Sequence, residues 1–180
     1  MKTRHFVSFL IVLLVSGTIF TARNSYSQRA TAKNNDLSVD FVDFLYNNAF
    51  TLQYEWKMAS TSSFLVRLQY VTKSENPGPT TALGVGGAWR FYIMDSRALQ
   101  GFSIAPAVDL FFFKNTPLSR NNILFSLGAD GGYKFFFDQI TVEPTLGVRI
   151  GFAPGNNLPP GESTFTGVYL VPSIYLGYAW

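Results

Sequence analysis

Carboxylates and cations are the side chains that could carry chemistry in this 180-residue sequence, which holds no cysteine and one histidine, His5. His5 falls in an N-terminal segment that we expect to be removed, so the mature chain lacks both residue types. A Ser-His-Asp triad, a Cys-His pair and histidine- or thiolate-bound zinc are therefore excluded. Acid and base catalysis by carboxylates and a calcium site of oxygen ligands stay open.

Ten charged residues share one side of segments in which polar and apolar residues alternate. They are Asp40, Glu55, Lys57, Arg67, Arg90, Asp109, Asp130, Lys134, Glu143 and Arg149. Five are acidic and five are basic, so we predict mutual ion pairs that form a neutral polar plug. The alternatives are a carboxylate site or a narrow gated path along the charges. Six glycines on the same side would make room for the charged chains or leave a small cavity: Gly84, Gly86, Gly128, Gly132, Gly147 and Gly151.

The N-terminus has the layout of a secretory signal peptide. Lys2 and Arg4 precede an apolar stretch over residues 6–20, and small residues follow at Ser25 and Ser27. We predict a signal peptide over residues 1–27, with a second possible cleavage site at 30–32. A short segment, 28–35, and a barrel domain, 36–180, would follow it.

Removing the signal peptide makes the chain electrically neutral. Lys2, Arg4 and Arg23 leave with it and no acid does, so 11 basic residues face 11 acidic residues. This balance gives no case for a nucleic-acid partner. The absence of cysteine also excludes a disulfide scaffold and an N-terminal lipid anchor.

Alternation with a period of two residues runs through the mature chain and predicts strands. Seven segments show it clearly, at 50–58, 64–70, 83–91, 102–112, 123–137, 140–152 and 168–180, and a weaker one lies near 37–45. We therefore expect an all-β fold of eight antiparallel strands with no helix between them. We expect short connections at 59–62, 95–99 and 138–139, and they alternate with longer connections at 73–80, 114–122 and 153–166. The connection at 46–48 is an exception, because it is short where this alternation requires a long loop.

The two faces of the strands distinguish a membrane barrel from a soluble eight-stranded barrel of lipocalin type. One face is almost uninterrupted in apolar residues and the other carries the charges, which is stable when the apolar face meets lipid. Aromatic residues on the apolar face gather at one rim, and we predict that they form a girdle at the membrane interface: Trp56, Trp89, Phe91, Tyr133, Phe135, Tyr178 and Trp180. Phe50, Tyr70, Phe112 and Phe152 mark the opposite rim.

A tight turn at Asp138 and Gln139 sets one register, because Phe137 and Ile140 both belong to the apolar face. Lys134 then faces Glu143 across the hairpin, unless a bulge shifts one strand. Removing only Glu143 would then strand a cation in the lumen.

A segment resembling Phe-x-Ile-x-Pro recurs around Pro106, Pro144 and Pro172. Because proline donates no ladder hydrogen bond, each should lie at a bulge or beside an opened pair.

These features resemble the small outer-membrane barrels of Gram-negative bacteria, the group of OmpX, OmpW and the membrane domain of OmpA, and similar proline segments occur in barrel domains of Bacteroidota. Aromatic residues at the last and third-last positions, Trp180 and Tyr178, resemble the signal that the barrel-assembly machinery reads. The resemblance implies an eight-stranded antiparallel up-and-down transmembrane β-barrel in the cell outer membrane, with outer-membrane lipid and the assembly machinery as partners.

Three classes of function follow for such a barrel. We favour a non-enzymatic protein that supports the envelope or binds a partner through its loops, with no cofactor, no catalytic residue and no metal site. A narrow channel for small or apolar solutes is the alternative, and a lipid-modifying enzyme is the third class. The loop Ala153–Thr166, which contains Pro159, Pro160 and Glu162, is the candidate for binding a partner.

The signal-peptide prediction is tested by N-terminal sequencing of the protein from isolated outer membranes. The mature chain should begin at Gln28 and carry no lipid. Recovery of a chain that begins at Met1, or recovery in the soluble periplasmic fraction, would contradict it.

Overall fold

The computed structural model describes residues 33–46, 48–75, 78–93, 99–115, 120–152 and 166–180. These residues lie in one compact unit, Ala32–Trp180. The expected signal peptide, residues 1–27, and residues 153–165 of the expected partner-binding loop lie outside the described residues.

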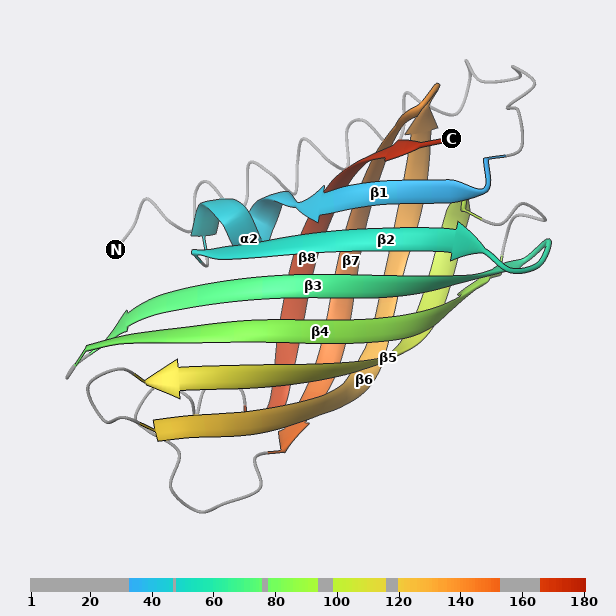
Figure 1. Ribbon diagram of the computed structural model, residues 1–180. Coiled ribbons are helices and arrows are strands. Elements are labelled where there is room, and N and C mark those ends of the chain that lie inside the picture. The colour runs from blue at the N-terminus through green and yellow to red at the C-terminus, as the bar shows by residue number, and fades with distance from the viewer. Residues whose placement is uncertain (1–32, 47, 76–77, 94–98, 116–119, 153–165) are drawn as a thin grey trace, which may run out of the picture. The chain divides into compact units, whose positions relative to one another are not determined.

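Eight antiparallel strands close into one barrel, in which each strand pairs with its neighbours in the sequence and β8 pairs with β1 (Figure 1). The strands are β1 (Asn35–Asp40), β2 (Ala49–Lys57), β3 (Ser62–Glu75), β4 (Gly78–Tyr92), β5 (Gly101–Asn115), β6 (Arg120–Phe137), β7 (Ile140–Phe152) and β8 (Gly167–Ala179). The predicted all-β, up-and-down barrel is confirmed. We call the end at which β1 begins and β8 ends the lower end, and the opposite end the upper end.

The strands are strongly staggered around the barrel. Ser38 of β1 pairs directly with Gly177 of β8, but following the paired residues the other way round, through β2 to β7, leads from Ser38 to Gly167. These two residues of β8 are ten positions apart, and a stagger of this kind requires strands tilted by about 35–45° to the barrel axis. Figure 1 accordingly shows the front strands crossing the rear strands obliquely.

Side chains alternate between a buried interior and an apolar exterior. On β5 the buried residues include Ala105 and Asp109, whereas Ile104, Val108 and Phe112 keep 42–48% of their surface exposed. A soluble protein does not leave a belt of large apolar side chains exposed around its whole circumference. The pattern therefore places lipid outside and charge inside.

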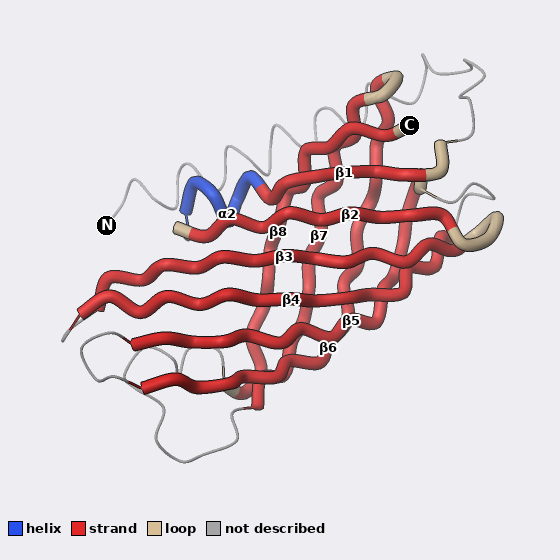
Figure 2. The backbone as a smooth tube through the Cα atoms, viewed as in Figure 1, coloured by secondary structure: helices blue, strands red, loops and turns tan. Residues whose placement is uncertain are grey.

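The first strand differs from the expectation of a strand near 37–45. Strand β1 ends at Asp40, and Phe41–Tyr46 forms a short helix, α2, so the expectation of no helix was wrong (Figure 2). Asp40 caps this helix, since its Oδ1 accepts hydrogen bonds from the backbone N–H groups of Val42 at 2.9 Å and Asp43 at 3.2 Å. Phe41, Phe44 and Leu45 follow at helical rather than strand spacing.

Two of the upper connections are much shorter than expected, because the strands extend into them. The connection expected at 73–80 shrinks to the residues between Glu75 and Gly78, and the one expected at 114–122 shrinks to those between Asn115 and Arg120. Strand pairing at the upper end therefore continues past the last apolar residues of the alternation. No helix among the described residues is long and apolar enough to span a bilayer.

The register of the β6–β7 hairpin agrees with the two-residue turn. Phe137 pairs with Ile140, and Asp138 adopts a left-handed conformation with φ of 61°.

Two of the expected prolines lie beside openings in the strand ladders. The β4–β5 ladder is interrupted beside Pro106 and the β6–β7 ladder beside Pro144, and each ladder has the same register on both sides of its interruption. The prediction of opened pairs is confirmed for these two prolines, without a bulge.

A charge scan tests which residues face lipid. Val108→Lys, at the middle of β5, should destabilise the barrel by about 2–4 kcal/mol, whereas Ile140→Lys, beside the lower turn, should cost about 0–1 kcal/mol. Urea unfolding in lipid vesicles measures both values. Equal costs at the two positions would contradict the proposed depth of Val108.

Candidate functional site

Three acids and two bases meet at the lower end of the lumen, in what we call the lower cluster: Asp36, Glu55, Arg90, Lys134 and Glu143. The Lys134 ammonium lies 2.7 Å from Asp36 Oδ2 and 2.5 Å from Glu55 Oε2, and it lies 3.2 Å from Glu143 Oε2. Arg90 lies 2.6 Å from Glu55 Oε2 and 2.8 Å from Glu143 Oε1. All five side chains are at most 3% exposed, so these charges are stabilised by one another rather than by water.

Neutral hydroxyl groups complete the hydrogen bonding of the lower cluster. Tyr92 donates its hydroxyl proton to Glu55 Oε1 at 2.8 Å, and Ser63 donates to the same oxygen. Thr141 donates to Asp36 Oδ1 at 2.8 Å. The lower cluster has one more acid than bases, and these hydroxyl groups stabilise its carboxylates by donating hydrogen bonds to them.

Two arginines and two aspartates form the upper cluster, above the lower one: Arg67, Asp109, Asp130 and Arg149. Arg149 lies 3.0 Å from Asp109 Oδ2 and 2.7 Å from Asp130 Oδ1. Arg67 lies 3.1 Å from Asp130 Oδ2 and 3.5 Å from Asp109 Oδ1. The upper cluster is therefore electrically balanced.

Three inward glycines make room for these charges. A Cβ atom at Gly86 would collide with the Asp109 carboxylate, and one at Gly147 would collide with that of Asp130. At Gly128 a Cβ atom would collide first with the backbone oxygen of Val148, and it would lie 2.9 Å from Cδ of Arg149. The sequence-based prediction that inward glycines accommodate charged side chains is confirmed most directly at Gly86 and Gly147.

The ten charged residues expected to form one network are placed in three ways. Eight of them form ion pairs, four in each cluster: Glu55, Lys134, Arg90 and Glu143 in the lower, and Arg67, Asp109, Asp130 and Arg149 in the upper. Asp40 instead caps α2. Lys57 is half-buried at the lower end of β2, and no ion pair joins it to another described residue.

Asp36 and Tyr92 were missed by the sequence reasoning. Asp36 lies four residues before Asp40 on the first strand, so both side chains point to the same side of the sheet. This spacing identifies the inward orientation of Asp36 once the register of β1 is known. The expected five-to-five network is thus corrected to two clusters. Lys134 and Glu143 do come together as predicted, but Lys134 also contacts two further acids, so loss of Glu143 does not strand it.

A cavity of about 260 Å³ lies next to the upper cluster. Arg67, Asp109 and Arg149 line its polar side, and Val71, Phe111 and Val171 are among its apolar lining residues. Phe111 also packs in an apolar group inside the barrel with Ala82, Phe113 and Leu124. We call this space the upper cavity. Paired charges fill the lumen below the upper cavity, and the upper cavity provides free volume near the upper end.

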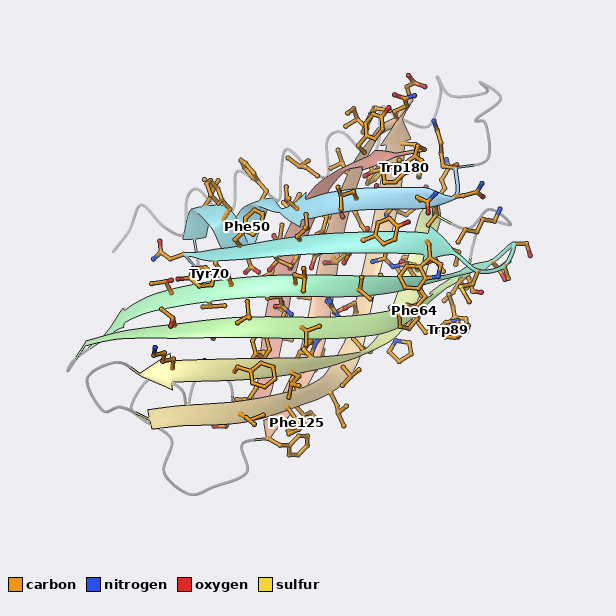
Figure 3. All side chains as sticks on the ribbon, in the orientation of Figure 1. Phe50, Phe64, Tyr70, Trp89, Phe125 and Trp180 are labelled. Atoms are coloured by element: carbon orange, nitrogen blue, oxygen red, sulfur yellow. The ribbon has the colours of Figure 1, made fainter. Side chains whose placement is uncertain are left out.

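The aromatic residues of the expected girdle lie on the exterior and contact one another across strands. Ring contacts run from Tyr178 to Trp180, on to Tyr54 and Trp56, and then to Phe64, with centroids 4.9–6.2 Å apart. The contacts continue from Phe64 through Trp89 to Phe91, and Tyr133 packs on Phe135. Figure 3 shows Phe64, Trp89 and Trp180 toward one end of the barrel and Phe50 and Tyr70 toward the other.

One closed sheet of eight strands carries an apolar belt and two aromatic rims on its exterior, and it encloses a charged lumen. Pairing around a closed sheet satisfies most of its backbone groups internally, which is the requirement for crossing hydrocarbon with strands. The chain is a small transmembrane β-barrel. Among the described residues, no group of three or more acids, histidines or cysteines is placed to hold a metal ion.

No family model matches this barrel, and no curated protein matches it. Among solved structures it is similar to the Yersinia pestis outer membrane protein Ail, determined in a phospholipid bilayer nanodisc. The two chains are 9% identical, the TM-score is 0.49, and the match covers 82% of this chain and 99% of Ail. The assignment of the fold rests on the strand pairing and the two faces of this chain itself.

Substitutions in the lower cluster test its balance of charge. Lys134→Met leaves three acids with one base and should destabilise the barrel by about 3–5 kcal/mol. Glu143→Gln leaves two acids with two bases and should cost only about 1–2 kcal/mol. Urea unfolding, with heat-modifiable gel mobility to identify the folded form, measures both.

Lys57→Met is the matched control for the lysine substitution. It removes the same charge from a half-buried position and should change the stability by less than about 0.5 kcal/mol. If Lys134→Met were as mild as Lys57→Met, the buried ion pairs of Lys134 would be disproved.

Proposed function

We propose that this protein is a non-enzymatic barrel of the outer membrane that supports the envelope without forming an open pore. The observation that carries the proposal is the pair of ionic clusters, which draw side chains from seven strands into the lumen. An eight-stranded barrel has an interior that side chains fill, so ion pairs across it leave little room for a water-filled path. A stable closed wall, rather than transport of bulk solutes, is the role that fits this interior.

The absence of histidine and cysteine from the mature chain supports the non-enzymatic part of the proposal. Hydrolysis of lipid or peptide in a barrel would need an activated nucleophile or a general base placed on a reactive group. The buried carboxylates have cations or hydroxyl groups as close partners, and Asp109, Asp130 and Glu55 all accept from more than one donor. Carboxylates held in this way are poorly placed to exchange protons with a substrate.

The outer-membrane location is supported by the design of the wall. Strand barrels with an apolar exterior and short connections at one rim are typical of that membrane. The predicted signal peptide provides export, and the C-terminal aromatic residues resemble the signal for the barrel-assembly machinery. Both termini of the barrel, at Asn35 and Ala179, lie at the lower end, which we place in the periplasm.

Single-channel recording tests the closed lumen. The purified barrel in a planar bilayer should show no stable large conductance. A double variant, Arg90→Ala with Arg149→Ala, removes one base from each cluster and should open small, steady current steps, because the two clusters lie one above the other.

The single variants provide the control in the same recordings. Each leaves one cluster intact and should conduct far less than the double variant. Porin-sized steps from the unmodified protein would overturn the proposal.

A further inference from the structure

The wall of the barrel lacks a strand on one side of its upper half. Strand β1 ends at Asp40, opposite Tyr175 of β8, and its pairing with β2 ends at Val39, opposite Leu52. Among the residues that the structure describes, β8 pairs above these points only with β7, and the upper part of β2 pairs only with β3. We call this interruption between β2 and β8 the seam.

Helix α2 packs against both β2 and β8 and therefore covers the seam. The cap provided by Asp40 holds its first turn, and Asp43 Oδ2 accepts a hydrogen bond of 2.7 Å from the Thr51 hydroxyl of β2. Phe41, Phe44 and Leu45 remain 44–62% exposed on the helix. Displacing a helix of six residues breaks far fewer hydrogen bonds than separating two paired strands, so the seam is the weakest part of the described wall.

Pro172 adapts β8 to the missing strand. Trp180 donates its backbone N–H to Asn35 of β1, and the β7–β8 register runs without a bulge, so even-numbered residues of β8 direct their nitrogens toward β1. The nitrogen of Pro172 therefore faces the seam. An unpaired N–H in hydrocarbon costs several kcal/mol, and proline has none to leave unpaired.

The upper cavity reaches the barrel exterior at the seam. Its lining includes Asp43 of α2, Ala49 of β2 and six residues of β8. Two of these, Leu170 and Pro172, belong to the outward set, and Leu170 is 65% exposed. A space lined both by lumenal residues and by lipid-facing residues opens sideways through the wall.

The polar side of the upper cavity offers hydrogen-bond donors. The Arg67 side chain is 6% exposed and lies beside the Tyr175 hydroxyl. Its Nε and Nη2 atoms make no well-formed hydrogen bond to the described residues, although Nη2 lies 3.5 Å from Asp109 Oδ1 as an ion pair. The two arginines that line the cavity, Arg67 and Arg149, are already paired with Asp109 and Asp130, and Asp43 adds a further acid to the lining. The site therefore calls for an acceptor without a negative charge.

We propose that the upper cavity binds the uncharged, hydrogen-bond-accepting head of a single-chain membrane amphiphile, such as a monoacylglycerol, which enters from the bilayer through the seam beneath α2. The head accepts from Arg67, and the first carbons lie against Val71, Phe111 and Val171. A volume of about 260 Å³ is below the ~300–1,000 Å³ of sites that enclose a whole drug-sized ligand, so the rest of the chain stays in lipid. This role goes beyond the closed lumen and does not depend on it.

Photolabelling in phosphatidylcholine vesicles tests the proposal. A monoacylglycerol with a diazirine near its head should label residues 169–173 of β8 in a saturable manner, and unlabelled monoacylglycerol should compete. Val171→Trp, which fills the cavity, should reduce this labelling about tenfold, because overpacking a site of this size opposes binding. Leu176→Trp is the matched control: it lies on the same strand below the seam, where β1 pairs with β8, and should leave the labelling unchanged.

Ala49→Leu fills the cavity from β2 and should have the same effect as Val171→Trp, and heat-modifiable mobility identifies folded protein in every sample. Non-saturable labelling spread over the exterior, unchanged by both cavity-filling variants, would overturn the site. Equal saturable labelling by a diazirine fatty acid at neutral pH would overturn the assignment of an uncharged head.

Discussion

The Lys134 ammonium needs carboxylates around it, because neither hydrocarbon nor an unfilled low-dielectric lumen stabilises an isolated charge. Its partners come from β1, β2 and β7, so the site exists only when β8 has closed on β1. The same constraint explains the inward glycines, which give the charged side chains their space. It also fixes the orientation of the wall, since a one-residue slip would turn these charges toward lipid.

The two ends of the barrel differ in how completely the wall is closed. At the lower end every strand pairs with both of its neighbours, although the ladders open beside Pro106 and Pro144. The buried charges there share their partners, and exterior aromatic rings contact one another from Trp180 through β2 and β3 to β4. At the upper end β1 gives way to the six-residue helix α2, and the upper cavity lies beside it. Rigidity and capacity for binding are thus separated along the barrel axis, as expected when a stable scaffold carries a local site of low stability.

The sequence predicts most of the fold because period-two alternation survives in every long strand. It also predicts the β6–β7 register, since the turn at Asp138 leaves no choice of phase between Phe137 and Ile140. It does not predict α2, because six residues are too few for helical periodicity to outweigh the neighbouring strand pattern. The sequence predicts that Lys134 meets Glu143, but its other two partners, Asp36 and Glu55, stay hidden for a different reason. The alternation along a strand shows whether a side chain faces the lumen or the lipid. The stagger of ten residues around the barrel decides which inward residues meet across the lumen.

The central claim is that Lys134 is a charged group enclosed by three carboxylates and shielded from water. NMR detection of the lysine side-chain ammonium protons, in isotope-labelled protein in lipid nanodiscs, tests it most directly, with Lys57 as the internal reference. The Lys134 signal should be visible at neutral pH, should exchange with water orders of magnitude more slowly than that of Lys57, and should disappear in Lys134→Met. An exchange rate for Lys134 as fast as that for Lys57 would mean that water fills the lower lumen, and it would contradict the account.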